Sequence, residues 1–173
     1  EVSHAVDPTG AIASLSGGVA RNAVPARAEA VLRVDAQGLP AAEGVDVASA
    51  GAGASRVIAH GVAGHAAEPA GATNAIGVLA NYLLGLGRLA PSEREFVSFC
   101  ARAVCSWDGS GLGIEASDDL FGPLTCVGGM LWTREGRFAL TLDVRLPAAA
   151  GVEGVCSGLE RAGSEHGCEV LIT

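Results

Sequence analysis

The strongest structural signal in the sequence is a predicted β-hairpin near its C-terminal end. Its arms run from Thr125 to Thr133 and from Arg137 to Leu146, and the tight connection Arg134-Glu135-Gly136 joins them. In the second arm, four apolar residues alternate with polar ones: Phe138, Leu140, Leu142 and Val144 with Arg137, Thr141, Asp143 and Arg145. Successive side chains of a strand point to opposite faces, so the apolar set is predicted to face the core and the polar set water or a cleft.

Two more strands are predicted before residue 38. The first runs from about Ala11 to Ala20, and the second from Arg27 to Val34. The second alternates cleanly, because Ala28, Ala30, Leu32 and Val34 share one face. The stretch from Gly38 to Ala54 is rich in Ala and Gly and has little periodicity, so it is interpreted as a connection and a place for a subdomain boundary.

Helical patterns follow a further strand, which is expected from Arg56 to about Gly64. Thr73 is predicted to cap a first helix, whose buried residues are Ile76, Leu79, Ala80, Leu83 and Leu86. Ser92 and Glu95 have the spacing of a capping box and predict a second helix with Phe96, Phe99, Cys100 and Ala103 inward. A third helix is expected from about Val152 to His166, ended by Gly167, before a last strand over 168–172.

The order of these elements predicts an α+β fold. From Arg56 onward the chain reads strand, two helices, strand, strand, helix and strand, which is the split βαβ order of ferredoxin-like folds with helices on one face of the sheet. The two earlier strands are expected to add to this unit. We therefore predict one domain over residues 1–173, with the additional strands in 1–37 and the ferredoxin-like unit in 55–173.

Composition excludes several classes of function. The 173 residues carry 11 basic residues, all of them Arg, against 19 acidic ones, and the net charge of −8 argues against nucleic-acid and membrane partners. The apolar run from Ala75 to Ala90 is interrupted by polar residues, so no membrane span is expected. Five cysteines without a Cys-x-x-Cys pair are interpreted as reduced thiols and favour a cytoplasmic location. A sequence that starts at Glu1 and has Met130 as its one methionine leads us to expect a segment of a longer protein.

Two residues are candidates for chemistry. His65 is flanked by small residues, which let a ligand approach the imidazole, and an imidazole can donate to an oxyanion or exchange a proton near neutral pH. A strand-end histidine bonded to a carbonyl is the structural alternative. Arg145, on the outward face of the hairpin arm, suits bidentate capture of a carboxylate. Its structural alternative is a surface pair with Asp143 or Glu135.

Three further residues leave more than one interpretation open. Asn22, just before Val24-Pro25, can either bond the local backbone as turn chemistry or reach a ligand. Asp118 and Asp119 can serve as a metal-binding pair, but adjacent acids in a loop more often cap the next turn or stay solvated. The four histidines show neither His-x-Asp nor His-Glu-x-x-His spacing, and no nucleophile elbow, phosphate loop or dinucleotide fingerprint is present. The segment alone is therefore not interpreted as a complete enzyme.

Four motifs in order resemble the lid, or dimerisation, domain of the zinc peptidase family that includes aminoacylase, carnosinase and the PepV-type dipeptidases. Gly64-His65-Ala66-Ala67-Glu68-Pro69 followed by Thr73-Asn74-Ala75-Ile76 is similar to that family's His…Pro…Asn-Ala-Ile signature. Gly17-Gly18-Val19-Ala20-Arg21-Asn22-Ala23-Val24-Pro25 resembles its Gly-Gly…Asn-x-Val-Pro stretch. Leu112-Gly113-Ile114 with Asp118-Asp119-Leu120-Phe121-Gly122, and the ending Asp143-Val144-Arg145-Leu146-Pro147, resemble the PepV-type branch in order and spacing.

The resemblance implies a function and three site residues. In that family a separate catalytic domain binds zinc, and the lid supplies a histidine that stabilises the oxyanion and groups that bind the substrate carboxylate. His65 matches the histidine, Arg145 the carboxylate-binding arginine, and Asn22 a substrate-contacting asparagine. The expected protein is a cytoplasmic zinc dipeptidase with its zinc ligands outside this chain, so the segment binds no metal and is inactive alone. Its partners would be a dipeptide, its own catalytic domain and, in a homodimer, a second copy.

A different class of function stays open beside this one. A non-catalytic ferredoxin-like module for protein interaction or ligand sensing would use the outward face of the hairpin as its contact surface. His65 would then be a structural residue.

Overall fold

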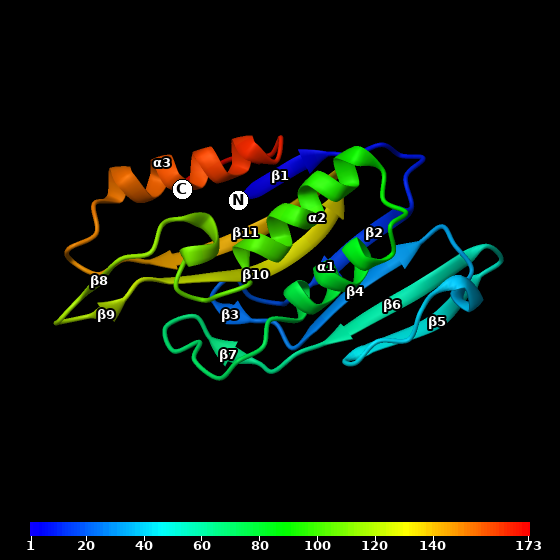
Figure 1. Cartoon of the computed structure of the whole chain (residues 1–173), viewed down its shortest axis with the longest axis horizontal. Helices are drawn as coiled ribbons and strands as arrows, with labels where there is room; N and C mark the ends of the chain where they lie inside the picture. The colour runs from blue at the N-terminus through cyan, green and yellow to red at the C-terminus, as the bar shows by residue number, and fades with distance from the viewer.

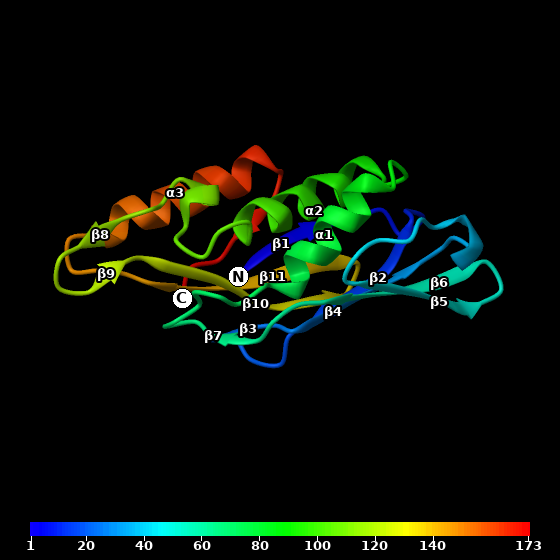
Figure 2. The same cartoon turned by 60° about the horizontal axis from the view of Figure 1, so that its bottom comes forward.

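The computed structural model describes all residues 1–173 and shows an α+β fold. Eight antiparallel strands form one sheet in the order β12-β1-β11-β10-β2-β4-β6-β5, and three helices pack on one of its faces (Figures 1 and 2). The strands of this sheet are β1 (Val2–Ala5), β2 (Ile12–Gly17), β4 (Arg27–Leu32), β5 (Val45–Gly51), β6 (Ala54–His60), β10 (Thr125–Arg134), β11 (Arg137–Arg145) and β12 (Glu169–Val170).

The remaining elements are the helices and two short ribbons. The α-helices are α1 (Ala75–Gly85), α2 (Pro91–Ala103) and α3 (Val152–Glu165), and single 3₁₀ turns lie at Ala36–Gly38 and Ser110–Leu112. The ribbons pair β3 (Ala23–Val24) with β7 (Gly64–His65), and β8 (Ser117–Asp118) with β9 (Gly122–Pro123). None of the helices has the length and apolarity needed to cross a bilayer.

The predicted hairpin is confirmed and lies in the middle of the sheet. Strands β10 and β11 pair along their whole length, and Glu135 and Gly136 turn the chain with φ of 53° and 71°. Two successive left-handed residues give a tight turn whose twist matches that of the strands. Phe138 and Leu140 are fully buried, and the Phe138 ring lies 5.7 Å from that of Phe96 in α2. The hairpin therefore supplies the floor on which the helices pack.

The predicted helical stripes are confirmed except for Leu86, which is half-buried and caps the C-terminal end of α1. Side chains on the inner faces of α1 and α2 are buried against the sheet: Ile76, Leu79, Ala80 and Leu83 in α1, and Phe96, Phe99, Cys100 and Ala103 in α2. In α3, Val155 and Leu159 face the core, and Gly167 follows the helix with a left-handed φ of 62°.

The position predicted for the strand after Arg56 is wrong. In a ferredoxin-like unit spanning 55–173, that strand would lie between the hairpin and the C-terminal strand. Strand β1, which was not predicted, takes that place between β11 and β12, while β6 lies on the far side of β2 and β4. Hydrophobic periodicity identifies strands but does not determine which neighbours they pair with.

The connection predicted between Gly38 and Ala54 is wrong as well. It contains the edge strand β5, which pairs with β6 from Val45↔Ala59 to Gly51↔Ala54. Most of its side chains are exposed, so the strand carries little hydrophobic pattern. Backbone hydrogen bonds to β6 hold it in place, and these are independent of side-chain pattern.

Both predicted helix caps are shifted. Asn74, rather than Thr73, is the N-cap of α1, and its Oδ1 accepts a hydrogen bond from Ile76 N at 2.9 Å. Helix α2 starts earlier than expected, with Pro91 at its first position. The glutamate that bonds to the N-cap backbone is therefore Glu93 instead of Glu95, and it accepts a hydrogen bond from Ala90 N at 2.8 Å.

Glu93 is a buried carboxylate that joins the helical layer to the sheet. It is 0% exposed, and besides Ala90 N it accepts hydrogen bonds from Ala11 N at 3.1 Å and Ile12 N at 2.7 Å. A Cβ at Gly10 would collide with this carboxylate, so a glycine is required there. Glu93 therefore fixes the start of β2 against the first turn of α2.

We predict that Glu93→Ala destabilises the fold by about 2–4 kcal/mol, because it leaves backbone N–H groups buried without an acceptor. Urea unfolding of the two proteins measures the difference. Glu153→Ala is the matched control: this glutamate lies exposed in the first turn of α3, and its loss should change stability by less than about 0.5 kcal/mol. Equal effects of the two substitutions would contradict the role of Glu93.

Candidate functional site

His65 and Asn22 are brought together by the short β3–β7 ribbon. His65 is the register partner of Ala23, the residue after Asn22, and Ala66 N donates a hydrogen bond to the Asn22 carbonyl at 3.0 Å. The ribbon lies beside β10 and leads into α1 (Figure 1). Two residues more than forty positions apart therefore share one small structural unit.

The His65 imidazole is exposed and accepts one hydrogen bond from its own loop. Ala67 N donates a hydrogen bond to its Nδ1 at 3.1 Å. A nitrogen that accepts a hydrogen bond carries no proton, so the neutral ring is assigned the tautomer with hydrogen on Nε2. This corrects the structural alternative of a histidine bonded to a carbonyl. The ring thus presents an exposed N–H donor.

The loop that carries His65 is closed at its base. Val62 N donates to Thr73 O at 2.9 Å, and Thr73 N donates to Val62 O at 3.0 Å. A Cβ at Gly61 would collide with the Thr73 carbonyl, so the two ends of the loop approach as closely as backbone allows. Residues 62–73 therefore form one compact loop, which is also joined to residues 22–24 through the β3–β7 ribbon and to Val127 of β10 through Ala66.

Asn22 is exposed in the turn before β3. Its backbone carbonyl holds the His65 loop, and no hydrogen bond from its carboxamide to the local backbone is found. The preceding turn projects outward at Val19, which is 96% exposed, and packs against β10, where a Cβ at Gly129 would collide with the Arg21 carbonyl. Asn22 is thus placed by its backbone and leaves its side chain accessible.

Arg145 lies at the end of β11, on a different element from His65. Its Nε is 3.1 Å from Asp143 Oδ1, and its side chain is 41% exposed, so the surface pair expected as the structural alternative is present. Such a pair contributes little to stability and can exchange partners. Thr141 on the same face is buried, so its predicted exposure to solvent is wrong, and its Oγ1 accepts a hydrogen bond from Met130 N at 3.0 Å.

A small apolar cluster connects the two parts of the site. Val127 is the register partner of Asp143, and it packs with Val24 and Ala66 in a buried group separate from the main core. Ala66 follows His65 directly. The loop of His65 and the strand end of Arg145 therefore approach β10 from opposite sides.

Sequence reasoning missed the β-bulge in β10 that accommodates these loops. The register shifts between Gly128 and Met130, and a Cβ at Gly128 would collide with Val104. Two adjacent glycines inside a predicted strand were the available signal, since glycine within a strand marks a bulge or a close backbone approach.

An open concavity of about 500 Å³ adjoins the β3–β7 ribbon. Its wall includes Gly64 and Ala23, the neighbours of His65 and Asn22, and also Arg27 and Glu29. Glu29 is paired with Arg27 at 3.0 Å and with Arg56 at 3.1 Å. His65, Asn22 and Arg145 do not line this concavity, so it adjoins the candidate site without containing its three residues.

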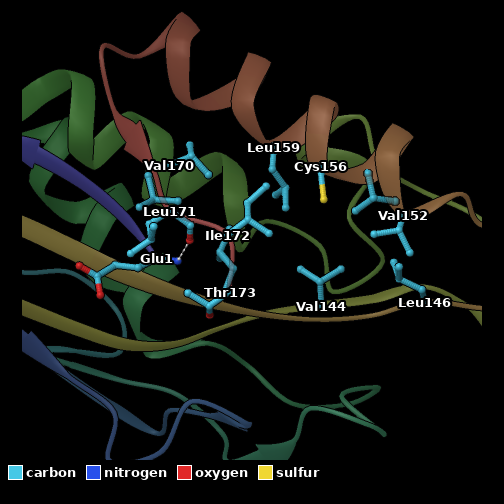
Figure 3. A pocket seen from close by; sticks show the side chains of 13 residues that line it. Glu1, Val144, Leu146, Val152, Cys156, Leu159, Val170, Leu171, Ile172 and Thr173 are labelled. Carbon is cyan, nitrogen blue, oxygen red and sulfur yellow. Dashed lines mark hydrogen bonds between the residues drawn. The ribbon is translucent and has the colours of Figure 1, made fainter.

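A second cavity has a different chemistry. Figure 3 shows a pocket of about 210 Å³ between α3, the end of β11 and the C-terminal residues, and 11 of its 13 lining residues are hydrophobic. Glu1 N donates a hydrogen bond to Leu171 O at 2.7 Å on its rim. Aliphatic side chains such as Val144, Leu159 and Ile172 give this pocket a mainly apolar lining.

Asp118 has the structural role that adjacent loop acids commonly take. Its Oδ1 accepts hydrogen bonds from Leu120 N at 3.0 Å and Phe121 N at 2.6 Å, and its Oδ2 accepts one from Ala149 N at 3.1 Å. It thereby joins the β8–β9 turn to the loop after β11. No group of three or more His, Cys, Asp or Glu side chains is placed to hold a metal ion.

Comparisons with known proteins add no family to this description. No protein-family model matches the chain, and no curated protein matches it significantly. The likeness to zinc peptidase lid domains therefore rests on the residues alone.

The pKa of Asp118 gives a testable pH dependence. Backbone N–H groups, that of Phe121 first, lower it from its ordinary value of 3.8. A carboxyl with a lowered pKa in the folded state stabilises the fold above its unfolded pKa, and this contribution is lost as the pH falls through the folded value. We expect Asp118→Asn to lower the melting temperature at neutral pH and the difference from wild type to shrink below about pH 4. Asp119→Asn is the control and should show no such trend; a pH-independent difference for Asp118→Asn would contradict this account.

Proposed function

We propose that this chain is the substrate-binding lid domain of a zinc-dependent dipeptidase, in which His65 stabilises the oxyanion and Arg145 binds the substrate carboxylate. The observation that carries the proposal concerns the His65 side chain: its imidazole is exposed, and its Nδ1 accepts a hydrogen bond from Ala67 N. In this proposal the zinc is held by a catalytic domain outside this chain. The zinc would supply an activated water for attack on the peptide bond.

His65 is suited to donate a hydrogen bond to a developing negative charge. With Nδ1 accepting from Ala67, a neutral ring directs its one N–H, at Nε2, away from its own backbone. A donor held in advance needs no rearrangement when the carbonyl oxygen of the substrate becomes an oxyanion. The small residues around the ring, Gly64 and Ala66, leave room for the substrate backbone.

Arg145 and Asn22 provide the recognition of a short peptide. A guanidinium can bind a carboxylate through two parallel hydrogen bonds, and Arg145 is held only by an exchangeable surface pair with Asp143. A free C-terminal carboxylate at a fixed distance from the scissile bond would restrict substrates to dipeptides. The exposed Asn22 carboxamide can donate to a substrate carbonyl or accept from its N–H.

The strand order supports a finer assignment of the fold within this proposal. Strands β12, β1, β11 and β10 lie side by side in that order, with helical crossovers between β1 and β10 and between β11 and β12. This is the arrangement of a ferredoxin-like split βαβ unit whose first strand is β1. Strands β2, β4, β6 and β5 would then extend its sheet, and they carry the connection to the ribbon of His65.

We predict that His65→Ala lowers kcat for dipeptide hydrolysis by about 10²-fold, as removal of an oxyanion donor does, with unchanged zinc content. The complete gene product that contains this chain is assayed for dipeptidase activity and zinc. His60→Ala is the matched control, since His60 is an exposed strand-end histidine paired with Asp46 at 2.8 Å, and its kcat should not change.

Two results would overturn the proposed function. One is a complete gene product that carries no zinc and does not hydrolyse dipeptides, which would favour the non-catalytic module. The other is a zinc dipeptidase in which His65→Ala leaves kcat unchanged.

Removal of Arg145 should act on binding rather than on the chemical step. We expect Arg145→Ala to raise KM for a dipeptide at least about tenfold and to abolish the preference for a free C-terminal carboxylate over its amide, because each charged hydrogen bond contributes about 1.5–3 kcal/mol. Arg134→Ala is the control, since Arg134 pairs in the same way with Glu135 at the opposite end of the hairpin. An unchanged preference in Arg145→Ala would contradict its role.

A further inference from the structure

We propose that Asn74 is a positioning residue that fixes the His65 loop to strand β10. This inference rests on the proposed function, because it assigns Asn74 a role in placing the catalytic imidazole. Asn74 touches no substrate in this role and acts through the loop.

Asn74 lies at the base of the loop and uses both ends of its carboxamide. Its Oδ1 accepts a hydrogen bond from Ile76 N at 2.9 Å and caps α1, while its Nδ2 donates to Gly128 O at 2.9 Å. The residue before it, Thr73, closes the loop through its paired hydrogen bonds with Val62. One side chain thus joins the loop base, the start of a helix and the central hairpin.

The Gly128 carbonyl lies at the β-bulge that also accommodates the Asn22 turn. The register of β10 shifts just after Gly128, and the next residue, Gly129, is in close contact with the Arg21 backbone. The neighbouring position Val127 pairs with Asp143, which holds Arg145. Gly128, which accepts the hydrogen bond from Asn74, is therefore next in sequence to Gly129, which contacts the Asn22 turn, and to Val127, which pairs with Asp143 beside Arg145.

Backbone hydrogen bonds from Gly61 N to Ala26 O and from Ala75 N to Pro25 O, both 2.9 Å, also hold the base of the loop, and Asn74 adds the side-chain hydrogen bond to β10. The apolar cluster beneath the loop has only three buried members, Val24, Ala66 and Val127, and it is separate from the main core of 31 residues. The ribbon β3–β7 has two residues in each strand. A loop with so little buried apolar surface depends on its polar contacts for a fixed position.

The two functions of Asn74 can be separated by substitution. Serine and aspartate are good N-caps and keep the acceptor for Ile76 N. Ionised aspartate has no hydrogen to donate to Gly128 O, and the serine hydroxyl is on a shorter side chain than the carboxamide nitrogen that it replaces. Loss of helix capping and loss of loop positioning therefore need not occur together.

The test measures dipeptide hydrolysis and melting temperature of the complete gene product with Asn74→Ser or Asn74→Asp. We expect a melting temperature close to that of the wild type, a KM within about twofold, and a kcat lowered about tenfold, because a small misplacement of a catalytic group is costly. Asn81→Ser, at an exposed position within α1, is the matched control and should leave kcat unchanged.

A double-mutant cycle distinguishes positioning from a general structural effect. If Asn74 acts through the imidazole, Asn74→Ser has no further effect on kcat once His65 is replaced by alanine. Losses that multiply in the double variant, or an unchanged kcat in both Asn74 variants, would overturn this inference and leave the role of His65 intact. An unchanged kcat in His65→Ala alone would instead overturn the proposed function.

Discussion

The pairing of β10 with β11 is the interaction on which the rest of the structure depends. The hairpin lies inside the sheet, with β1 bound to one side and β2 to the other, and its buried side chains meet α2. Its tight turn is local, so the pairing can form before the long-range contacts of the sheet. The same hairpin carries the bulge at Gly128 and ends at Arg145, so it also determines where the site can be built.

A core with few aromatic rings needs polar contacts to align its layers. Aromatic residues make up 4% of the chain, and the helices pack on the sheet mainly through Ala, Val, Leu and Ile. Aliphatic packing is favourable in many arrangements, whereas a hydrogen bond to a buried carboxylate has one geometry. Glu93 has this role, since its three backbone donors come from both the strand layer and the helical layer.

The candidate site combines an exposed imidazole with an exposed guanidinium. The His65 ring is oriented by its own loop through Ala67 N, and the loop is attached to the sheet by few contacts. Arg145 is held by one exposed ion pair at a strand end. Low local stability around a binding site is typical of parts that move or exchange partners during function. The separation of these groups on the free chain is compatible with a lid that completes its site only when it closes over a second domain.

The sequence by itself determined the local elements: the hairpin with its Glu135-Gly136 turn, most of the buried faces of three helices, and a histidine between a strand and a proline turn. Each depends on neighbouring residues, on turn chemistry or on a period of 2.0 or 3.6. Only the tertiary structure decided that β1 takes the place predicted for β6, that β5 is a strand, and that Asn74 and Glu93 make the caps. It also decided that Asn22 and His65 share a ribbon while Arg145 comes from another strand. The reason is that strand partners and loop contacts are chosen by backbone hydrogen bonds and by packing between distant segments, which leave no periodic trace in the sequence.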